Sequence, residues 1–188
     1  MDHATDHATT AALEAGLDEI RAAPADLGRI ELIVRRPAED QREVLAEARL
    51  DPAEGLAGDT WLARGNRRSP DGRADPDKQL TLMNARLAAL IAGDPDRRPL
   101  AGDQFYLDLD ISQTNLPAGS RLALGSAVIE LTAPPHTGCA KFAARFGRDA
   151  LRFVNSPVGR ELRLRGANAR IVVAGTVRTG DEVRKLPG

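Results

Sequence analysis

The chain's single cysteine, Cys139, lies in the segment with the clearest potential for chemistry, residues 134–142 (PPHTGCAKF). The two prolines favour an extended backbone, and Thr137 is predicted to cap a helix that has Cys139 in its first turn. The positive end of the helix dipole, together with Lys141 and Arg145, would stabilise the thiolate over the thiol. The segment therefore predicts a nucleophilic sulfur that can accept sulfur or bind a soft metal.

A structural role for the same cysteine is the alternative interpretation. Cys139, Phe142, Ala143 and Phe146 recur at the spacing of one helix face, and a buried cysteine often acts as a small hydrophobe. His136 precedes Cys139 by three positions, where it could orient or deprotonate the thiol or simply be exposed. The residues alone leave both interpretations open.

The last third of the chain is basic, whereas the rest is acidic. Residues 141–185 contain eleven Lys and Arg against four Asp and Glu, a charge of +7, in a chain whose net charge is −1. Arginine's planar fork suits an anionic ligand such as a phosphate, although most of these side chains are expected to be solvated or locally ion-paired. One or two of them are predicted to contact a ligand.

Short strands dominate the elements that must position these residues. A mainly β fold with inserted short helices, a β-barrel, is therefore predicted rather than a doubly wound sheet. Alternation and β-branched residues indicate strands over residues 28–36, 42–50, 78–83, 105–111, 121–124, 128–132, 168–174 and 182–185.

Helices are predicted where capping residues precede apolar positions at helical spacing. The polar run over residues 63–77 (ARGNRRSPDGRADPD) is instead expected to be a long loop, functional or disordered. Three helices are expected to be capped by Thr10, by Asn84 (ending at Gly93) and by Ser156 (with Pro157 in the first turn). Two more are expected over residues 139–146 and 149–154.

Composition limits the class of protein. With 188 residues, 42% of them apolar, one core is expected, in a domain over residues 28–188 that follows a tail and short helix over residues 1–27. The balanced charge and 3% aromatic content argue against nucleic acid, and no apolar run approaches the roughly 18 residues of a membrane span. An acidic start and a lone cysteine favour a cytoplasmic protein.

Several short motifs follow one another in an order that resembles a MOSC domain, the module at the C-terminal end of molybdenum cofactor sulfurases that also occurs as small stand-alone bacterial proteins. The resemblance extends from about Gly28 to Lys185. The motifs are residues 55–59 (GLAGD), 78–82 (KQLTL), 101–105 (AGDQF), 132–135 (TAPP) and 138–141 (GCAK).

The resemblance implies a MOSC-type β-barrel that handles a molybdenum-pterin cofactor or sulfur, with Cys139 as persulfide carrier or molybdenum ligand. A cofactor-bound member could reduce N-hydroxylated compounds with electrons from a partner protein. The alternatives are a carrier module without turnover and a barrel that has lost its site. Pyridoxal phosphate would remain on a separate cysteine desulfurase, and the oligomeric state stays open.

The residues implied to bind the cofactor are Lys78, Asp103, Gln104, Lys141 and Arg145. Two motifs depart from the family pattern. This chain has Gly-Asp-Gln at residues 102–104, where the family commonly has Gly-Glu-Asn, and Lys78 where the family commonly has arginine. Lysine lacks the arginine fork, so phosphate binding would change most. Near them, Asp59 is expected to cap a helix or form an ion pair, and Trp61 to pack at the pocket edge.

Overall fold

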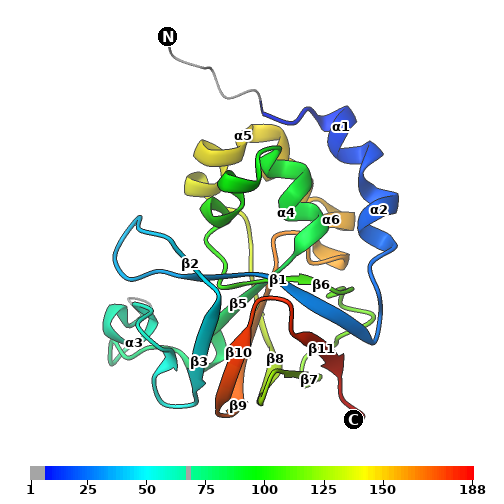
Figure 1. The fold of residues 1–188 in the computed structure, drawn as a ribbon. Helices are drawn as coiled ribbons and strands as arrows, with labels where there is room; N and C mark the ends of the chain where they lie inside the picture. Colours follow the sequence, from blue (N-terminus) through cyan, green and yellow to red (C-terminus); the bar gives the residue numbers. More distant parts are fainter. Residues whose placement is uncertain (1–6, 67–68) are drawn as a thin grey trace.

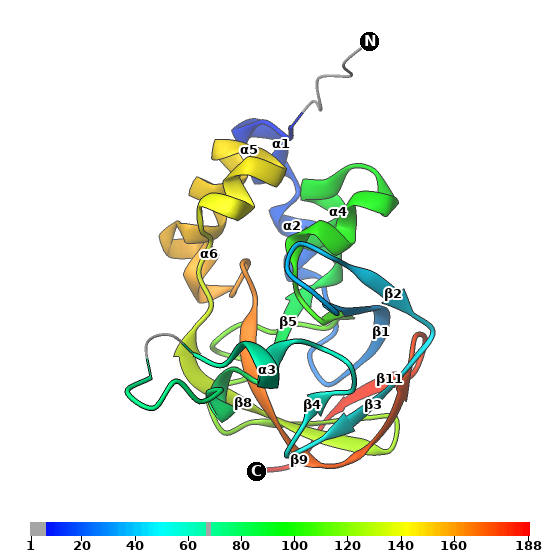
Figure 2. The same cartoon turned by 90° about the vertical axis from the view of Figure 1, so that its left-hand side faces the viewer.

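The computed structural model describes residues 7–66 and 69–188, so the first six residues of the expected tail lie outside it. Seven strands form a closed barrel in the order β11-β7-β8-β9-β5-β6-β1, and β1 pairs with β11 to complete it (Figures 1 and 2). Among the described strand pairs, β5 and β6 alone run parallel. The β-barrel prediction is confirmed. Its strands are β1 (Leu27–Arg35), β5 (Leu80–Asn84), β6 (Phe105–Asp108), β7 (Arg121–Leu124), β8 (Ala127–Pro135), β9 (Ala167–Val173) and β11 (Glu182–Lys185).

A second, three-stranded sheet has the order β10-β3-β4. The prediction of a single strand over residues 42–50 is wrong, because this stretch divides between the two sheets. Its first part pairs with β1 and its second part with β10, and at the break the carbonyl of Ala46 accepts a hydrogen bond from the Thr179 amide. These elements are β2 (Glu43–Leu45), β3 (Glu47–Asp51), β4 (Gly55–Leu56) and β10 (Gly175–Arg178).

The helices α1, α2, α4 and α5 gather at one end of the barrel (Figure 1). Asn84 caps α4 by accepting hydrogen bonds from the amides of residues 86 and 87, and Ser156 caps α6, as predicted. The first helix is capped by Thr9 rather than by Thr10. The helical segments are α1 (Thr10–Ala15), α2 (Leu17–Arg21), α3 (Trp61–Arg64), α4 (Ala85–Ala92), α5 (Ala140–Asn155), α6 (Pro157–Glu161), and the 3₁₀ turns η1 (Pro76–Lys78) and η2 (Pro95–Ala101).

The start of α5 differs from the prediction. Cys139 is the N-cap residue, with extended backbone, and Thr137 lies outside the helix. The cause is a pair of hydrogen bonds between the Asn155 side-chain amide and the backbone N–H (3.0 Å) and carbonyl (3.3 Å) of Gly138. They hold Gly138 against the far end of the same helix. The two helices expected over 139–146 and 149–154 are both present within α5, where they meet at a kink at Gly147, whose backbone is not helical (φ 90°, ψ 165°).

Two apolar clusters hold the barrel and helices together. Leu82 and Phe105 belong to a cluster made mostly of barrel-strand residues. Met83 and Tyr106, the next residue on each strand, belong to a second cluster with residues of α1, α2, α4 and α5. Neighbouring side chains of a strand point to opposite faces, so alternate residues of β5 and β6 pack into different clusters. Both faces of β5 are therefore covered, and every residue of β5 is buried.

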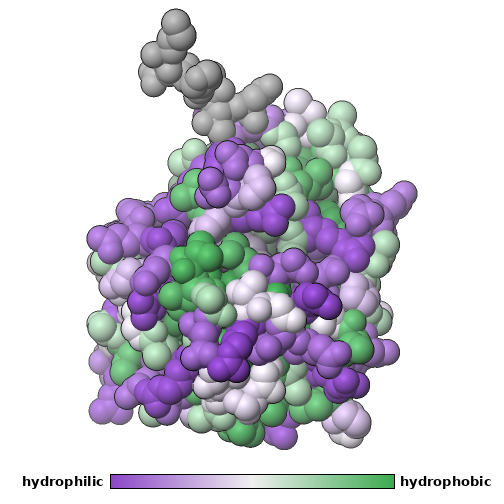
Figure 3. Space-filling model, viewed as in Figure 1, coloured by the Kyte–Doolittle hydropathy of each residue, from purple (hydrophilic) through white to green (hydrophobic). Residues whose placement is uncertain are grey.

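The face shown in Figure 3 is mixed, with a hydrophobic area over β2 among hydrophilic residues; Val44 of β2 is 57% exposed. Among the residues that the structure describes, no helix combines the length and apolar character that crossing a bilayer requires.

Candidate functional site

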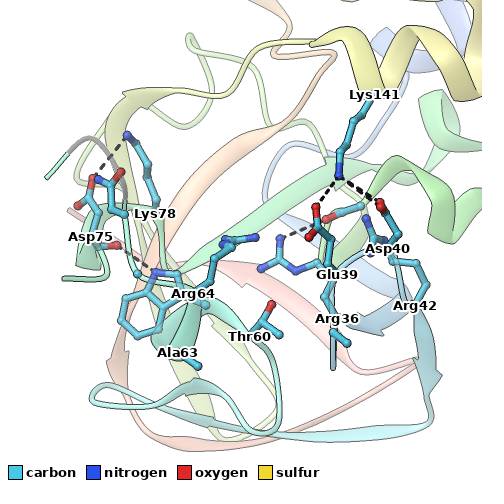
Figure 4. Close-up of a pocket in the computed structure, with 15 residues that line it drawn as sticks. Arg36, Glu39, Asp40, Arg42, Thr60, Ala63, Arg64, Asp75, Lys78 and Lys141 are labelled. Carbon is cyan, nitrogen blue, oxygen red and sulfur yellow. Dashed lines mark hydrogen bonds and ion pairs between the residues drawn. The ribbon is translucent and has the colours of Figure 1, made fainter. Parts of the chain in front are cut away.

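A cavity of about 780 Å³ opens beside the end of β1, the segment around α3 and the first turn of α5 (Figure 4). We call it the arginine cavity. Five of its lining residues are basic and three are acidic. The basic residues are Arg36, Arg42, Arg64, Lys78 and Lys141, the acidic residues are Glu39, Asp40 and Asp75, and the others are Ala38, Thr60, Trp61, Ala63, Gly65, Asn66 and Gly102.

Arg36 is the fixed cation of this cavity. Its Nε and Nη2 lie 2.9 Å from the two carboxylate oxygens of Asp59, a side chain with no solvent exposure. Its Nη1 donates to the carbonyl of Gly102 at 3.3 Å. Asp59 also accepts a hydrogen bond from the Trp61 amide (2.9 Å), so it is both an ion-pair partner and a cap near the start of α3.

Arg64 and Arg42 are less fully paired. In Figure 4 the Arg64 side chain points into the cavity toward Arg36, and it forms no hydrogen bond or ion pair with a described residue. Burial, followed by the positive charge of Arg36, lowers the pKa of Arg64. The Nε of Arg42 is buried without a hydrogen-bond partner among the described residues, and burial and the charges of Arg145 and Arg36 lower the pKa of the Arg42 guanidinium. These lowered pKa values reflect burial and repulsion between neighbouring guanidinium groups, and an anion bound in the cavity would reduce that repulsion.

The cations of α5 are paired with the loop that follows β1. Lys141 Nζ lies 3.2 Å from Glu39 and 3.3 Å from Asp40, and Arg145 Nη2 lies 2.9 Å from Asp40. The hydrogen bond and charge of Lys141 lower the pKa of Asp40. Lys141 lines the cavity, whereas Arg145 is not among the lining residues. Lys78 does line it, 3.5 Å from Asp75.

Asp103 and Gln104 lie behind the cavity walls. Both are fully buried, and neither is a lining residue of the arginine cavity. Gln104 accepts two hydrogen bonds at 2.8 Å from Thr81, through the backbone amide and the hydroxyl. Any role of Gln104 toward a cofactor would therefore act through the position of β5.

Asp103 joins two other side chains of the interior. Its carboxylate lies 2.7 Å from Arg165 Nη1 and 3.1 Å from His136 Nε2. Burial alone would raise the pKa of Asp103, but Arg165 and His136 outweigh it and lower the pKa. The guanidinium of Arg165 also lies over the ring of Phe142, 5.0 Å from its centroid.

Cys139 is exposed, whereas Phe142 and Phe146 of the same helix are buried. The alternative that Cys139 is a buried core residue is therefore wrong. The sulfur makes no capping hydrogen bond, and Cys139 does not itself line the arginine cavity, although Lys141 two positions later does. Within the described ranges no hydrogen bond joins His136 to Cys139, because the imidazole faces Asp103.

The side chains present fit an anionic group better than a bare metal ion. Across residues 7–66 and 69–188, no cluster of three or more His, Cys, Asp and Glu side chains could hold a metal. One exposed thiol near a basic cavity instead fits a metal cofactor whose organic part carries a phosphate and supplies most of the metal's ligands.

Sequence reasoning missed the most informative cations, Arg36, Arg42 and Arg64. The available signals were the pair Arg35-Arg36 at the end of a predicted strand and an arginine three positions after the only tryptophan. The expected loop over residues 63–77 is partly helical, because α3 and η1 overlap its two ends. Its described part contributes lining residues on both sides of positions 67 and 68, which lie outside the described residues.

The structure is a closed mixed β-barrel with a cavity lined by five basic residues. The family model for the MOSC domain matches residues 71–184, and the chain belongs to this family. The family is generally linked to molybdenum cofactor sulfurase-like proteins.

Solved structures agree on the fold. YuaD from Bacillus subtilis is 18% identical, with a TM-score of 0.58 over 84% of this chain and 94% of that one. YiiM from Escherichia coli is 17% identical, with a TM-score of 0.55 over 85% and 70%. YiiM from Geobacillus stearothermophilus is 14% identical, with a TM-score of 0.56 over 85% and 75%. A sequence comparison with curated proteins finds no match.

Proposed function

We propose that this protein binds a molybdenum-pterin cofactor, whose phosphate is held in the arginine cavity, and that Cys139 is the sulfur-bearing or metal-ligating residue. The observation that carries the proposal is the Arg64 guanidinium, which points into the cavity beside Arg36 without a partner among the described residues. An arginine fork is suited to the oxygens of a phosphate.

The basic residues of the arginine cavity would have different roles in binding. Asp59 fixes the Arg36 guanidinium, so little side-chain entropy remains to be lost when a ligand binds. Arg64 and the partly unpaired Arg42 would supply the additional charge that a phosphate needs. Lys141 holds the loop at residues 39–40 against α5, and Lys78 adds a cation on the wall near Asp75.

The reaction proposed for the loaded protein is the reduction of N-hydroxylated compounds. When bound, the cofactor would supply the redox centre. Each turnover consumes two electrons, from a separate electron-donor protein, and two protons, and it releases the reduced nitrogen compound and water. The chain's own residues would bind the cofactor and hold it near the start of α5. A reducing cytoplasm would keep the exposed thiol available.

A sulfur or cofactor carrier is the second candidate, and the exposure of Cys139 favours it. In the sulfur-transfer step, the Cys139 thiolate attacks the terminal sulfur of a persulfide on a partner cysteine desulfurase. The sulfur–sulfur bond of the donor breaks, a new one forms on Cys139, and the donor cysteine leaves as a thiolate. Pyridoxal phosphate chemistry takes place only on that partner.

Metal and pterin analysis tests the proposal. The protein is purified natively from a molybdenum-replete host, and molybdenum and pterin fluorescence are measured per chain. We expect about one equivalent of each for a single site. Arg64→Gln should reduce cofactor retention about fivefold or more, because it removes a charge-assisted contact.

Arg148→Gln is the matched control, since Arg148 is exposed, does not line the arginine cavity and has no side-chain partner among the described residues. It should retain cofactor as the wild type does. Absence of molybdenum and pterin, with sulfur labelling of Cys139 by a desulfurase, would favour the carrier. Absence of molybdenum, of pterin and of sulfur labelling would favour the remaining interpretation, a barrel that has lost its site.

A further inference from the structure

A second cavity, of about 680 Å³, shares no lining residue with the arginine cavity. We call it the histidine cavity. It opens between residues 132–137 at the end of β8, the segment 159–168 that leads from α6 into β9, and parts of the loop over residues 113–118. The polar groups that matter below are His136, Arg160, Arg163, Arg165 and Asn168.

The charge of this cavity is one-sided. Three arginines and a histidine line it, and its described lining contains no aspartate or glutamate, although Arg165 is paired with Asp103 behind the wall, so Arg160 and Arg163 supply the uncompensated charge. In the arginine cavity, by contrast, three carboxylates offset part of the positive charge. A concave site that presents guanidinium groups without lining carboxylates attracts small anions.

Two of the donors differ in how they are held. Arg163 is fixed, because its Nη1 donates to the carbonyls of Leu116 (2.6 Å) and Ile111 (3.4 Å). Its backbone has a φ of 49°, a left-handed conformation that is uncommon for a residue with a side chain. Arg160 is exposed, and its side chain makes no hydrogen bond or ion pair within the part of the chain that the structure describes. It is therefore free to close on a ligand.

The imidazole of His136 lies in front of the Asp103 carboxylate. Its Nε2 is 3.1 Å from that carboxylate, but Nε2 and Asp103 Oδ1 are both buried without a hydrogen-bond partner among the described residues. Gly166 permits this approach, because a Cβ there would lie 3.1 Å from His136 Cδ2 and 2.3 Å from the carbonyl of Leu82. The ring thus forms part of the cavity wall, and neither of its nitrogens makes a hydrogen bond with a described residue.

We propose that the histidine cavity is a second binding site, for a small molecule that carries a carboxylate or a phosphate. Arg160 and Arg163 pair with the oxyanion, and His136 provides the neighbouring polar contact. Apolar walls, including Pro117 and Val154, cover the uncharged part of the molecule. This site is independent of the proposed cofactor site, because its residues and its ligand are different.

The test is a titration of the ¹⁵N-labelled full chain with inorganic phosphate and, separately, with acetate at constant ionic strength. Backbone amide shifts of Gly159, Gly166 and Asn168 report on the histidine cavity, and those of Thr60 and Gly102 on the arginine cavity. We expect saturable shifts at the first group with at least one of the two anions. The anion that binds more tightly identifies the preferred oxyanion.

Arg160→Gln should weaken this binding about fivefold, because it removes one charge-assisted contact. His136→Asn is the second variant, and it should also weaken binding. Arg148→Gln removes the same charge outside both cavities and should have no effect. Shifts confined to Thr60 and Gly102, no saturable shift with either anion, or equal weakening by Arg148→Gln would overturn the proposal. None of these results depends on a pterin, so failure here is separate from failure of the proposed function.

Discussion

Arg36 and Asp59, 23 positions apart in the sequence, form a two-pronged ion pair in which both nitrogen–oxygen distances are 2.9 Å. The pair ties the chain just after β1 to the segment before α3, and both segments line the arginine cavity. The Asp59 side chain is fully buried, and among the described residues Arg36 is the one cation that pairs with it directly. The same contact thus stabilises the fold and presents a fixed guanidinium to a ligand.

Asp59→Asn should lower the free energy of unfolding by about 3 kcal/mol, because it leaves a largely buried guanidinium without its counter-charge. Urea denaturation measures the change. Glu39→Gln is the control, since it breaks the exposed pair of Glu39 with Lys141 and should leave stability almost unchanged. Equal effects of the two substitutions would show that the Arg36–Asp59 pair has no special structural role.

Gln104→Leu should destabilise the protein by about 2 kcal/mol, since it leaves the buried amide and hydroxyl of Thr81 without their acceptor. Thermal and urea unfolding report the loss. Gln41→Leu alters an exposed glutamine whose side chain has no hydrogen bond among the described residues, and should have little effect. A stable Gln104→Leu variant would contradict the positioning role of Gln104 behind β5.

Cys139→Ser should leave stability unchanged, because the side chain is exposed and makes no capping hydrogen bond. Sulfur labelling by a desulfurase, and any retained molybdenum, should be lost, since serine is a poor nucleophile and a poor soft-metal ligand. Mass spectrometry of the labelled chain and metal analysis are the measurements. A destabilised variant with unchanged labelling and metal content would refute the assignment of Cys139.

Stability should decrease as the pH falls from about 6.5 toward 5. Burial, followed by the charge of Arg165, lowers the pKa of His136, although Asp103 opposes the shift; Arg36 adds a smaller lowering effect. The unfolded chain therefore binds a proton at a higher pH than the folded chain does, and acid favours unfolding. Asp103 remains ionised in this range because its own pKa is lowered.

The measurement for this prediction is the free energy of unfolding at several pH values between 5 and 7. His136→Asn should reduce the slope over that range. A wild-type slope that persists in the variant would assign the pH dependence to other groups.

Local signals in the sequence predicted several elements well. Asn84 and Ser156 cap helices because their side chains bond backbone amides only two or three residues away. The turn at residues 125–126 joins β7 and β8 as expected. Such interactions involve neighbours in the chain, so residue type and spacing suffice to predict them. The start of α5 was misplaced because Asn155, which holds Gly138, is 17 residues away.

The sequence by itself determined that this is a mainly β protein with late helices, a single cysteine before one of them and a MOSC-like order of motifs. Only the tertiary structure decided that β11 closes the barrel on β1 and that residues 43–51 divide between two sheets. It also decided that Arg36, Arg42 and Arg64 meet in one cavity while Asp103 and Gln104 lie behind the walls. The physical reason is that strand pairing and ion pairing depend on contacts between distant segments, and local propensity carries no information about which distant segments meet.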